Sequence, residues 1–246
     1  MKIENKEFWE IENVIEVQDK NKAATNFELF MFEKAKELFA STGVIKTIKI
    51  FGCGTGREVE QIASFYKPSQ IIASDISENM IEKCKENLKE WKIDSITEAI
   101  VINAKDYNKV ENKFDLVTIL NSMLTYVSEK KDRVEIFKNS YQVAKPSGVL
   151  IGTVHNQEGS LLKTVYFKVR NLLSFYYGDK VGNRVTGYNG FEVQGYYYNK
   201  KELIKDIQSA GFKSVEVYSL EEYYALSNIT YDRNKGYNNL IFIAQK

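Results

Sequence analysis

The chain has 246 residues, of which 43% are hydrophobic and 27% charged, so it can bury a sizeable core and is expected to form one globular domain. Its 34 Lys and Arg nearly balance 33 Asp and Glu, and the net charge of +1 provides no global attraction to nucleic acid or a membrane. A polar N-terminus, the lack of an apolar run of about 18 residues and two cysteines without a pattern predict a reduced, cytoplasmic protein with no transmembrane helix.

Short apolar strands are predicted to alternate with amphipathic helices along most of the chain. Thr25 and Glu28 form a capping box that predicts a helix before the alternation starts. Helical periodicity then appears at 59–66, after a cap at Ser77, and in a stripe after Ser128 that includes Val134 and Ala144. Five β-branched runs are typical of strands buried on both faces: 47–51, 70–75, 99–103, 115–120 and 149–154.

The C-terminal part predicts two more strands. Asn199 and Glu202 mark a helix start and Gly211 its end, before a sixth strand around 215–217 and a seventh at 240–244. Residues 219–239 show no clear helical pattern, whereas a parallel pair would need a crossover that is usually helical. The last strand is therefore predicted to be antiparallel. The predicted fold class is α/β: a doubly wound, seven-stranded, mostly parallel sheet with helices on both faces.

Three glycines, Gly52, Gly54 and Gly56, follow the first strand and open a helix. Each glycine lowers stability by about 0.5–1 kcal/mol relative to alanine, through the entropy of the backbone. Three of them in one loop indicate that a side chain there would be in the way, as it would be where the main chain contacts a ligand. A simple strand-to-helix turn is the alternative. The G-x-G-x-G spacing differs from the G-x-G-x-x-G that binds a pyrophosphate, which makes an NAD-dependent oxidoreductase a less suitable assignment.

Three motifs in order resemble the class I S-adenosylmethionine (SAM)-dependent methyltransferases: GCGTGR at 52–57, SDISENM at 74–80, and FDLVTILNSM at 114–123 with AKPSGVLIGTV at 144–154. The resemblance covers roughly residues 45–246. It implies SAM as the cofactor, an enzyme of this class, and in-line transfer of a methyl group to an N or O atom of a small molecule. The domains expected are an N-terminal helical extension or lid (1–44) and a SAM-binding domain (45–246) with a substrate-capping insertion (155–198).

The resemblance implies a cofactor site at the ends of the first four strands. Asp75 can accept hydrogen bonds from both ribose hydroxyls, although a helix cap is its alternative role. Ile76 is expected on the adenine face or in the core. Asn103, a turn residue otherwise, and Ala104 can match the adenine edge, for which Asp106 is a substitute. The predicted cofactor-binding residues are Gly52, Cys53, Gly54, Gly56, Asp75, Ile76, Asn103, Ala104 and Leu120.

One position departs from the family pattern. Two residues before Gly52 the family usually carries Asp or Glu, which helps to hold the methionine moiety, whereas this chain has Ile50. The ammonium group would then depend on carbonyl oxygens near Gly52 and Leu120. A protein that binds SAM or S-adenosylhomocysteine (SAH) without catalysis therefore stays an alternative.

Catalysis in this class depends on alignment, which can supply up to roughly 7–11 kcal/mol of the barrier. His155, the sole histidine, follows the fifth strand and is predicted as a base or substrate contact, with a surface loop histidine as the alternative. Asn121 and Tyr126 share the carboxyl edge of the sheet and are predicted to orient the substrate. No metal site is predicted.

The aromatic insertion at 155–198 is expected either to cap the acceptor or to pack in the ordinary way. It also holds Lys163, Lys168 and Arg170, which leaves an RNA (cap- or tRNA-type) methyltransferase as an alternative. The near-neutral charge favours a small-molecule partner, with no nucleic acid and no membrane, and a monomer or homodimer.

Overall fold

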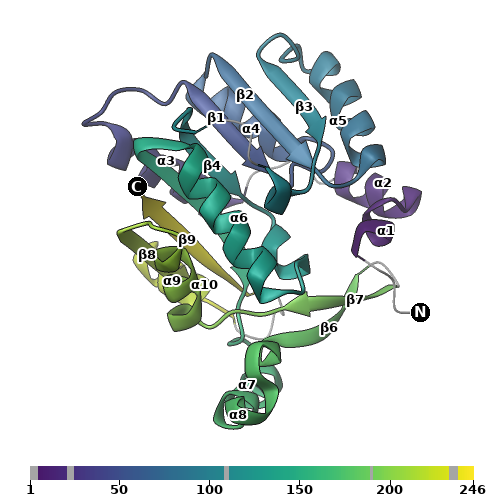
Figure 1. Cartoon of the computed structure of the whole chain (residues 1–246), viewed down its shortest axis with the longest axis vertical. Coiled ribbons are helices and arrows are strands. Elements are labelled where there is room, and N and C mark those ends of the chain that lie inside the picture. The colour runs from purple at the N-terminus through teal and green to yellow at the C-terminus, as the bar shows by residue number, and fades with distance from the viewer. Residues whose placement is uncertain (1–4, 21–24, 108–110, 189–190, 233–237) are drawn as a thin grey trace.

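The computed structural model describes residues 5–20, 25–107, 111–188, 191–232 and 238–246. Its main sheet has seven strands in the order β3-β2-β1-β4-β5-β9-β8 (Figure 1). Strands β1 to β5 run parallel, whereas β9 is antiparallel to both β5 and β8. The predicted fold class is confirmed. The strands are β1 Thr47–Phe51, β2 Gln70–Asp75, β3 Thr97–Val101, β4 Phe114–Ile119, β5 Ala144–His155, β8 Ser214–Ser219 and β9 Asn239–Gln245.

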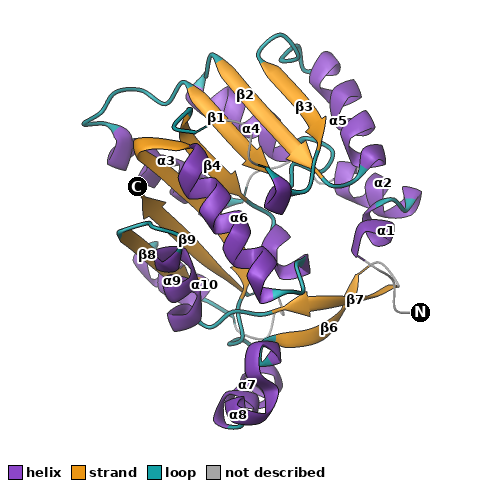
Figure 2. Cartoon of the chain, in the orientation of Figure 1, coloured by secondary structure: helices purple, strands orange, loops and turns teal. Residues whose placement is uncertain are grey.

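Helices cover both faces of this sheet (Figure 2). Because strand side chains alternate, Ile48 and Ile50 of β1 enter one hydrophobic core and Phe51 enters the other. The second core is covered by α6 (Lys130–Val143) and α9 (Lys200–Ser209). The helices that contribute to the first core are α3 Asn26–Phe39, α4 Arg57–Tyr66, α5 Glu78–Glu90 and α10 Leu220–Leu226.

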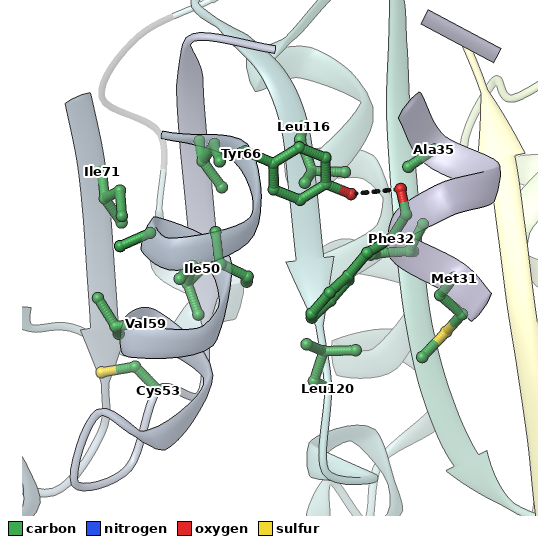
Figure 3. Close-up of a cluster of buried hydrophobic side chains, with 14 of the residues drawn as sticks. Met31, Phe32, Ala35, Ile50, Cys53, Val59, Tyr66, Ile71, Leu116 and Leu120 are labelled. Carbon is green, nitrogen blue, oxygen red and sulfur yellow. Dashed lines mark hydrogen bonds between the residues drawn. The ribbon is translucent and has the colours of Figure 1, made fainter. Parts of the chain in front are cut away.

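Helix α3 lies in the predicted N-terminal extension but packs directly into the first core (Figure 3). The Tyr66 hydroxyl of α4 donates to the Phe32 carbonyl oxygen of α3 at 2.8 Å. Ile50 is 1% exposed within this cluster, beside Leu116 and Leu120. The predicted capping box of Thr25 and Glu28 is present at the start of α3. Residues 26–39 therefore stabilise the sheet itself.

Two further parts surround the carboxyl ends of the strands. At the N-terminus, α1 (Asn5–Trp9) and α2 (Glu12–Lys20) lie beside α5 (Figure 1). The insertion after β5 holds α7 (Leu161–Leu172), α8 (Ser174–Tyr177) and an antiparallel hairpin of β6 (Asn183–Tyr188) and β7 (Phe191–Tyr196). Short 3-10 helices are η1 Ala104–Asp106, η2 Met123–Tyr126 and η3 Gly178–Lys180.

Several predicted boundaries are wrong. The third strand is Thr97–Val101 rather than 99–103, and Ala144 begins β5 instead of ending the preceding helix. Helix α10 falls in 219–239, where no helix was predicted, because its 7 residues make too few turns to show periodicity.

Candidate functional site

A cavity of about 870 Å³ lies at the carboxyl ends of β1, β2, β3 and β4. Its lining comes from α1 and α2 on one side, from the loops that follow these strands, and from η3, β6 and β7 on the other side. Ligand sites typically measure about 300–1,000 Å³, and open α/β sheets bind ligands at this edge. The cavity is therefore the candidate active site.

The glycine loop presents bare main chain to this cavity. Gly54 has φ +52° and nothing within 4 Å of the place where a Cβ would stand. Gly52 has φ +69°, and a Cβ there would come within 2.5 Å of Met123 Cγ. Both backbone conformations favour glycine, and both residues line the cavity. A side chain at Gly54 would occupy the space that a ligand needs.

Asp75, at the end of β2, is held in place by main-chain donors. Its Oδ2 accepts from Gly54 N at 2.9 Å, and its Oδ1 accepts from Ser77 N at 3.0 Å. Burial is the main cause that raises the pKa of Asp75 above its ordinary value. A carboxylate has about four lone-pair positions, so each oxygen keeps one for a hydroxyl of a ligand in the cavity.

The loops after β2 and β3 form one end of the cavity, where Ile76, Asn103 and Ala104 belong to its wall. Asn103 Oδ1 accepts from Lys105 N at 3.2 Å, so this side chain also begins the turn of η1. Asp106 is exposed and is not among the described residues that line the cavity. The apolar side chain of Ile76 and the polar groups of Asn103 and of the Ala104 main chain suit an adenine ring.

The N-terminal helices cover the cavity from the side of α5. The indole ring of Trp9 meets the Tyr126 ring edge-on at 5.0 Å between centroids, and Asn5 Nδ2 donates to the Tyr126 carbonyl oxygen. Glu10 accepts from Glu78 N and Asn79 N, at 2.9 and 3.3 Å. This carboxylate sits at the N-terminus of α5, a position where negative charge is stabilised.

Asn121 and Ser122, in the turn after β4, have an unusual conformation, with φ of +53° and +57°. L-residues rarely adopt these angles, which indicates backbone strain at this point. Ser122 N donates to Thr153 Oγ1 of β5 at 2.9 Å, and Asn121 Nδ2 donates to Gln18 Oε1 of α2 at 3.3 Å. The strained turn thus presents Asn121 to the cavity.

The structure brings together eight of the twelve predicted site residues on the wall of the cavity: Gly52, Gly54, Asp75, Ile76, Asn103, Ala104, Asn121 and Tyr126. The other four are absent from its described lining. Cys53 is 1% exposed and Leu120 is 2% exposed, with both side chains in the first core. At Gly56, a Cβ would lie 3.0 Å from Cys84 Sγ, so this glycine allows close packing on α5.

His155, the fourth residue, lies behind Tyr126. Its ring centroid is 6.3 Å from that of Tyr126 and 5.1 Å from that of Tyr197. Burial, with a smaller effect of Lys163, lowers the pKa of His155 to about 4. Such a histidine is neutral at pH 7 but a weak base, because general bases act best with a pKa near the working pH. Its catalytic role stays a prediction.

We expect His155→Gln to remove part of the acid sensitivity of the fold. His155 takes up a proton near pH 6.5 in the unfolded chain but only near pH 4 in the folded protein. Stability is therefore lost as the pH falls through this window, by up to about 3 kcal/mol. Denaturant unfolding at a series of pH values should show a steeper decline for the wild type than for the variant. Equal slopes would contradict the buried neutral state.

A buried ion cluster supports the glycine loop from behind. Arg57 Nη2, directly after Gly56, contacts Glu28 Oε1 at 2.6 Å and Glu58 Oε1 at 2.8 Å. The side chains of Arg57, Glu28 and Glu58 are 10%, 3% and 4% exposed. Because one arginine joins α3 to α4, the cluster fixes the loop relative to the core that contains Ile50.

Sequence reasoning missed several residues of the cavity wall. Gln18, Met80, Lys180, Asn183 and Gln194 all line it, from α2, α5, η3, β6 and β7. Met80 ends the SDISENM motif but was given no role, and the other four belong to no motif and come from distant parts of the chain. Only the folding of the insertion and of the N-terminal helices brings them to one place.

Two general properties of the described part of the chain bear on the chemistry. No group of three or more His, Cys, Asp or Glu side chains there could hold a metal ion. Over the same residues, no helix is long and apolar enough to span a bilayer.

The cavity wall fits the cofactor that the resemblance implied. The open space over Gly54 and the lone pairs left on Asp75 suit a ribose, and the wall near Ile76 and Asn103 suits the adenine. Gly52 lines the same cavity beside these groups. Ile50, which replaces the usual acidic residue, has no carboxylate to offer, and its side chain lies in the first core.

Comparisons with known proteins agree with this geometry. Residues 48–148 match the family described as "Methyltransferase domain". The chain is 29% identical over 107 residues to YqeM of Bacillus subtilis, a protein named as a methyltransferase, and 34% identical over 103 residues to the carboxy-S-adenosyl-L-methionine synthase of Shewanella pealeana. Each alignment covers 42% of this chain, and 40% and 37% of the relatives.

Among solved structures, the N-methyltransferase NodS of Bradyrhizobium japonicum, in complex with SAH, has a TM-score of 0.62 at 14% identity and covers 99% of both chains. Residues 48–148 thus form a methyltransferase domain, and the chain has the fold of class I SAM-dependent methyltransferases. The predicted class agrees with the family match over residues 48–148, and the fold is that of NodS, which was solved with SAH bound.

Proposed function

We propose that this protein transfers the methyl group of SAM to an N or O atom of a small-molecule acceptor. One observation carries the proposal: a single cavity joins the nucleoside-type wall of Gly52, Gly54 and Asp75 to a polar wall from η3, β6 and β7. Room for a nucleoside and a second ligand side by side is what a two-substrate transfer needs.

The second wall supports a small, polar acceptor. Tyr126, Lys180, Asn183 and Gln194 offer hydrogen-bonding groups to a ligand in the cavity. NodS, an N-methyltransferase, has the same fold. An extended RNA would need a basic groove, whereas Asp75, Glu129 and Asp132 share this cavity wall with its lysines, which favours a small molecule.

When bound, SAM supplies a methyl group already activated by a sulfonium. The protein then has to hold the acceptor in line and exclude water. We assign the orientation of the acceptor to Asn121 and Tyr126, which line the cavity. We place His155 behind Tyr126 as a positioning residue, because its ring packs at 6.3 Å from the Tyr126 ring. Trp9 and Asn5 close the cavity over Tyr126 from α1.

The test is to incubate the protein with SAM and panels of small amines, phenols and carboxylates, with capped RNA and tRNA as separate arms. Mass spectrometry should detect SAH together with a small acceptor that has gained one methyl group. Methylated RNA would favour the RNA alternative. A nucleoside that itself gains a carboxyl group would point to a carboxy-SAM synthase. Tight SAH binding without any product would favour a binding protein.

Asn121→Gly is expected to lower turnover without unfolding the protein. Glycine keeps the backbone at φ +53° at no cost, so stability should stay within about 1 kcal/mol of the wild type. Loss of one hydrogen-bonding side chain from the acceptor wall should reduce kcat/KM for the acceptor roughly three- to tenfold. Steady-state kinetics with the acceptor found above provide the measurement.

The matched control is Ser122→Gly, at the neighbouring position with φ +57° and a buried side chain. It relieves the same backbone strain outside the described cavity wall and should keep full activity. If the two variants behave alike, the Asn121 side chain plays no part in orienting the acceptor.

A further inference from the structure

Helices α7 and α8 carry a large apolar surface that faces solvent. Leu162, Leu172 and Phe175 are 84%, 80% and 85% exposed, values far from those of core residues. Within the described part of the chain, 9 of the 16 exposed large hydrophobic side chains fall in this short segment. They form the α7–α8 face: Leu161, Leu162, Val165, Tyr166, Val169, Leu172, Leu173, Phe175 and Tyr176.

These side chains share one side of the helix. Successive helical residues turn by about 100°, so the exposed apolar residues from 161 to 173 fall within an arc of about 140°. The opposite side holds Phe167, which is 1% exposed and packs on Tyr197 at 5.4 Å between ring centroids. Helix α7 therefore packs on the protein through its inner face, whereas the apolar residues of its outer face are exposed to solvent.

Basic residues flank the apolar arc. Residues 160–185 contain five Lys and Arg and a single acidic residue, Asp179, although the whole chain has a net charge of only +1. Lys168 and Lys180 are exposed, and Arg170 is half-buried. By the same helical geometry, Lys168 lies at one edge of the arc and Arg170 just beyond the other. Arg170 Nε also donates to the Val181 carbonyl oxygen at 2.8 Å. Asp179 is paired with Lys130 at 3.1 Å.

We propose that the α7–α8 face docks on an anionic lipid surface, with α7 lying in the plane of the interface. An apolar face bordered by Lys and Arg is the pattern of interfacial helices, in which the apolar side chains enter the headgroup boundary and the cations meet lipid phosphates. At 12 residues, α7 is about 18 Å long, too short to cross a hydrocarbon core of about 30 Å.

The positive charge beside the α7–α8 face favours an anionic lipid surface over a second copy of the chain as its partner. A two-fold contact through the α7–α8 face would bring Lys168 and Arg170 of each copy close to those of the other, and like charges repel. Anionic lipid has the complementary sign. The total charge of the chain hides this feature, because the basic excess is confined to one segment.

The docking face adjoins the acceptor side of the cavity. A second, more open hollow of about 480 Å³ includes Tyr166 and Tyr176 of the α7–α8 face. It shares Lys180, Asn183 and Gln194 with the main cavity. Docking would therefore set the acceptor wall next to the lipid, whatever reaction the cavity performs.

The experiment is co-sedimentation of the full chain with vesicles of phosphatidylcholine alone or mixed with phosphatidylglycerol. The wild type should bind the mixed vesicles, and less so as salt rises. A triple variant, Leu162→Ser with Leu172→Ser and Phe175→Ser, should lower the partition coefficient at least about tenfold. Lys168→Glu should lower it about tenfold. All four positions are exposed, and circular dichroism checks the fold.

The matched controls remove the same number of exposed apolar side chains elsewhere (Val44→Ser, Leu226→Ser, Ile229→Ser) and reverse an exposed lysine on α5 (Lys85→Glu). Both should bind like the wild type. The proposal is overturned if the wild type ignores the mixed vesicles, if variants and controls bind alike, or if light scattering shows a dimer that only the triple variant disrupts. Methyl transfer is not measured, so this result is independent of the proposed function.

Discussion

Replacing Asp75 with alanine is expected to weaken the binding of SAM and SAH by at least about a hundredfold. The carboxylate is fixed by Gly54 N and Ser77 N and lines the cavity. Loss of two hydrogen bonds from ribose hydroxyls to a charged acceptor costs about 1.5–3 kcal/mol each, and each 1.4 kcal/mol is tenfold in affinity. Isothermal titration calorimetry gives the dissociation constants directly.

The pH dependence of that affinity has a defined sign. Burial raises the pKa of Asp75, so its protonated form appears at a higher pH than for an ordinary aspartate. Since the ionised form is the stronger acceptor, wild-type affinity should decline as the pH falls toward this raised value. The Asp75→Ala variant should lack that decline.

Asp115→Ala is the control for a lost carboxylate. Asp115 also accepts from main-chain donors, Lys46 N and Thr47 N at 2.8 Å each, but it lies near the amino end of β4, away from the cavity. Its removal should lower stability and leave the affinity of the folded protein for SAM unchanged. A dissociation constant of Asp75→Ala within about threefold of the wild type would mean that the ribose is held elsewhere.

Arg57→Ala should be the most destabilising of the substitutions considered, at about 3–5 kcal/mol. Its removal leaves Glu28 and Glu58 buried without a counter-charge, and the loss of one partner from a buried ion cluster typically costs this much. Burial already raises the pKa of Glu58 in the wild type. Denaturant unfolding monitored by circular dichroism measures the effect.

The deficit of Arg57→Ala should shrink at acidic pH. Burial raises the pKa of Glu58, and the variant also lacks the lowering effect of Arg57, so its folded state binds a proton on Glu58 more readily than the unfolded state and gains stability relative to the wild type as the pH falls. The exposed pair of Lys34 and Glu37 provides the comparison, because Lys34→Ala should change stability by less than about 1 kcal/mol. A loss that small for Arg57→Ala would indicate that water solvates the cluster.

The sequence correctly predicted those site residues that lie directly at or after the end of a strand. The motif GCGTGR follows β1, and Asp75 ends β2, so their positions follow from where buried strands stop. Because neighbouring parallel strands have their carboxyl ends at the same edge of the sheet, the glycine loop and Asp75 are expected to lie close together once the strands are recognised. The antiparallel direction of β9 and the cap at Ser77 were also predicted, and the structure confirms both.

The directions of the side chains could be predicted less well from the sequence. Cys53 and Leu120 lie in the predicted segments, yet their side chains turn into the core, and His155 stands behind Tyr126. A strand end fixes the place of a residue along the sheet, but the packing of neighbouring helices decides which face its side chain occupies. Asn121 lies within the motif FDLVTILNSM, but its positive φ angle, which presents it to the cavity, could not be predicted from that motif.

The sequence alone determined the order of the strands in the chain, the glycine loop and the acidic end of β2, because these depend on residues near each other in the chain. Only the tertiary structure decided which segments close the cavity and which apolar faces stay outside. Gln18 and Gln194 line one cavity although they are far apart in the chain, and Phe167 is buried while Leu162 is exposed on the same helix. In the sequence, an aromatic or aliphatic residue that will be buried cannot be distinguished from one that will be exposed. Its burial depends on which other segments of the chain pack against it.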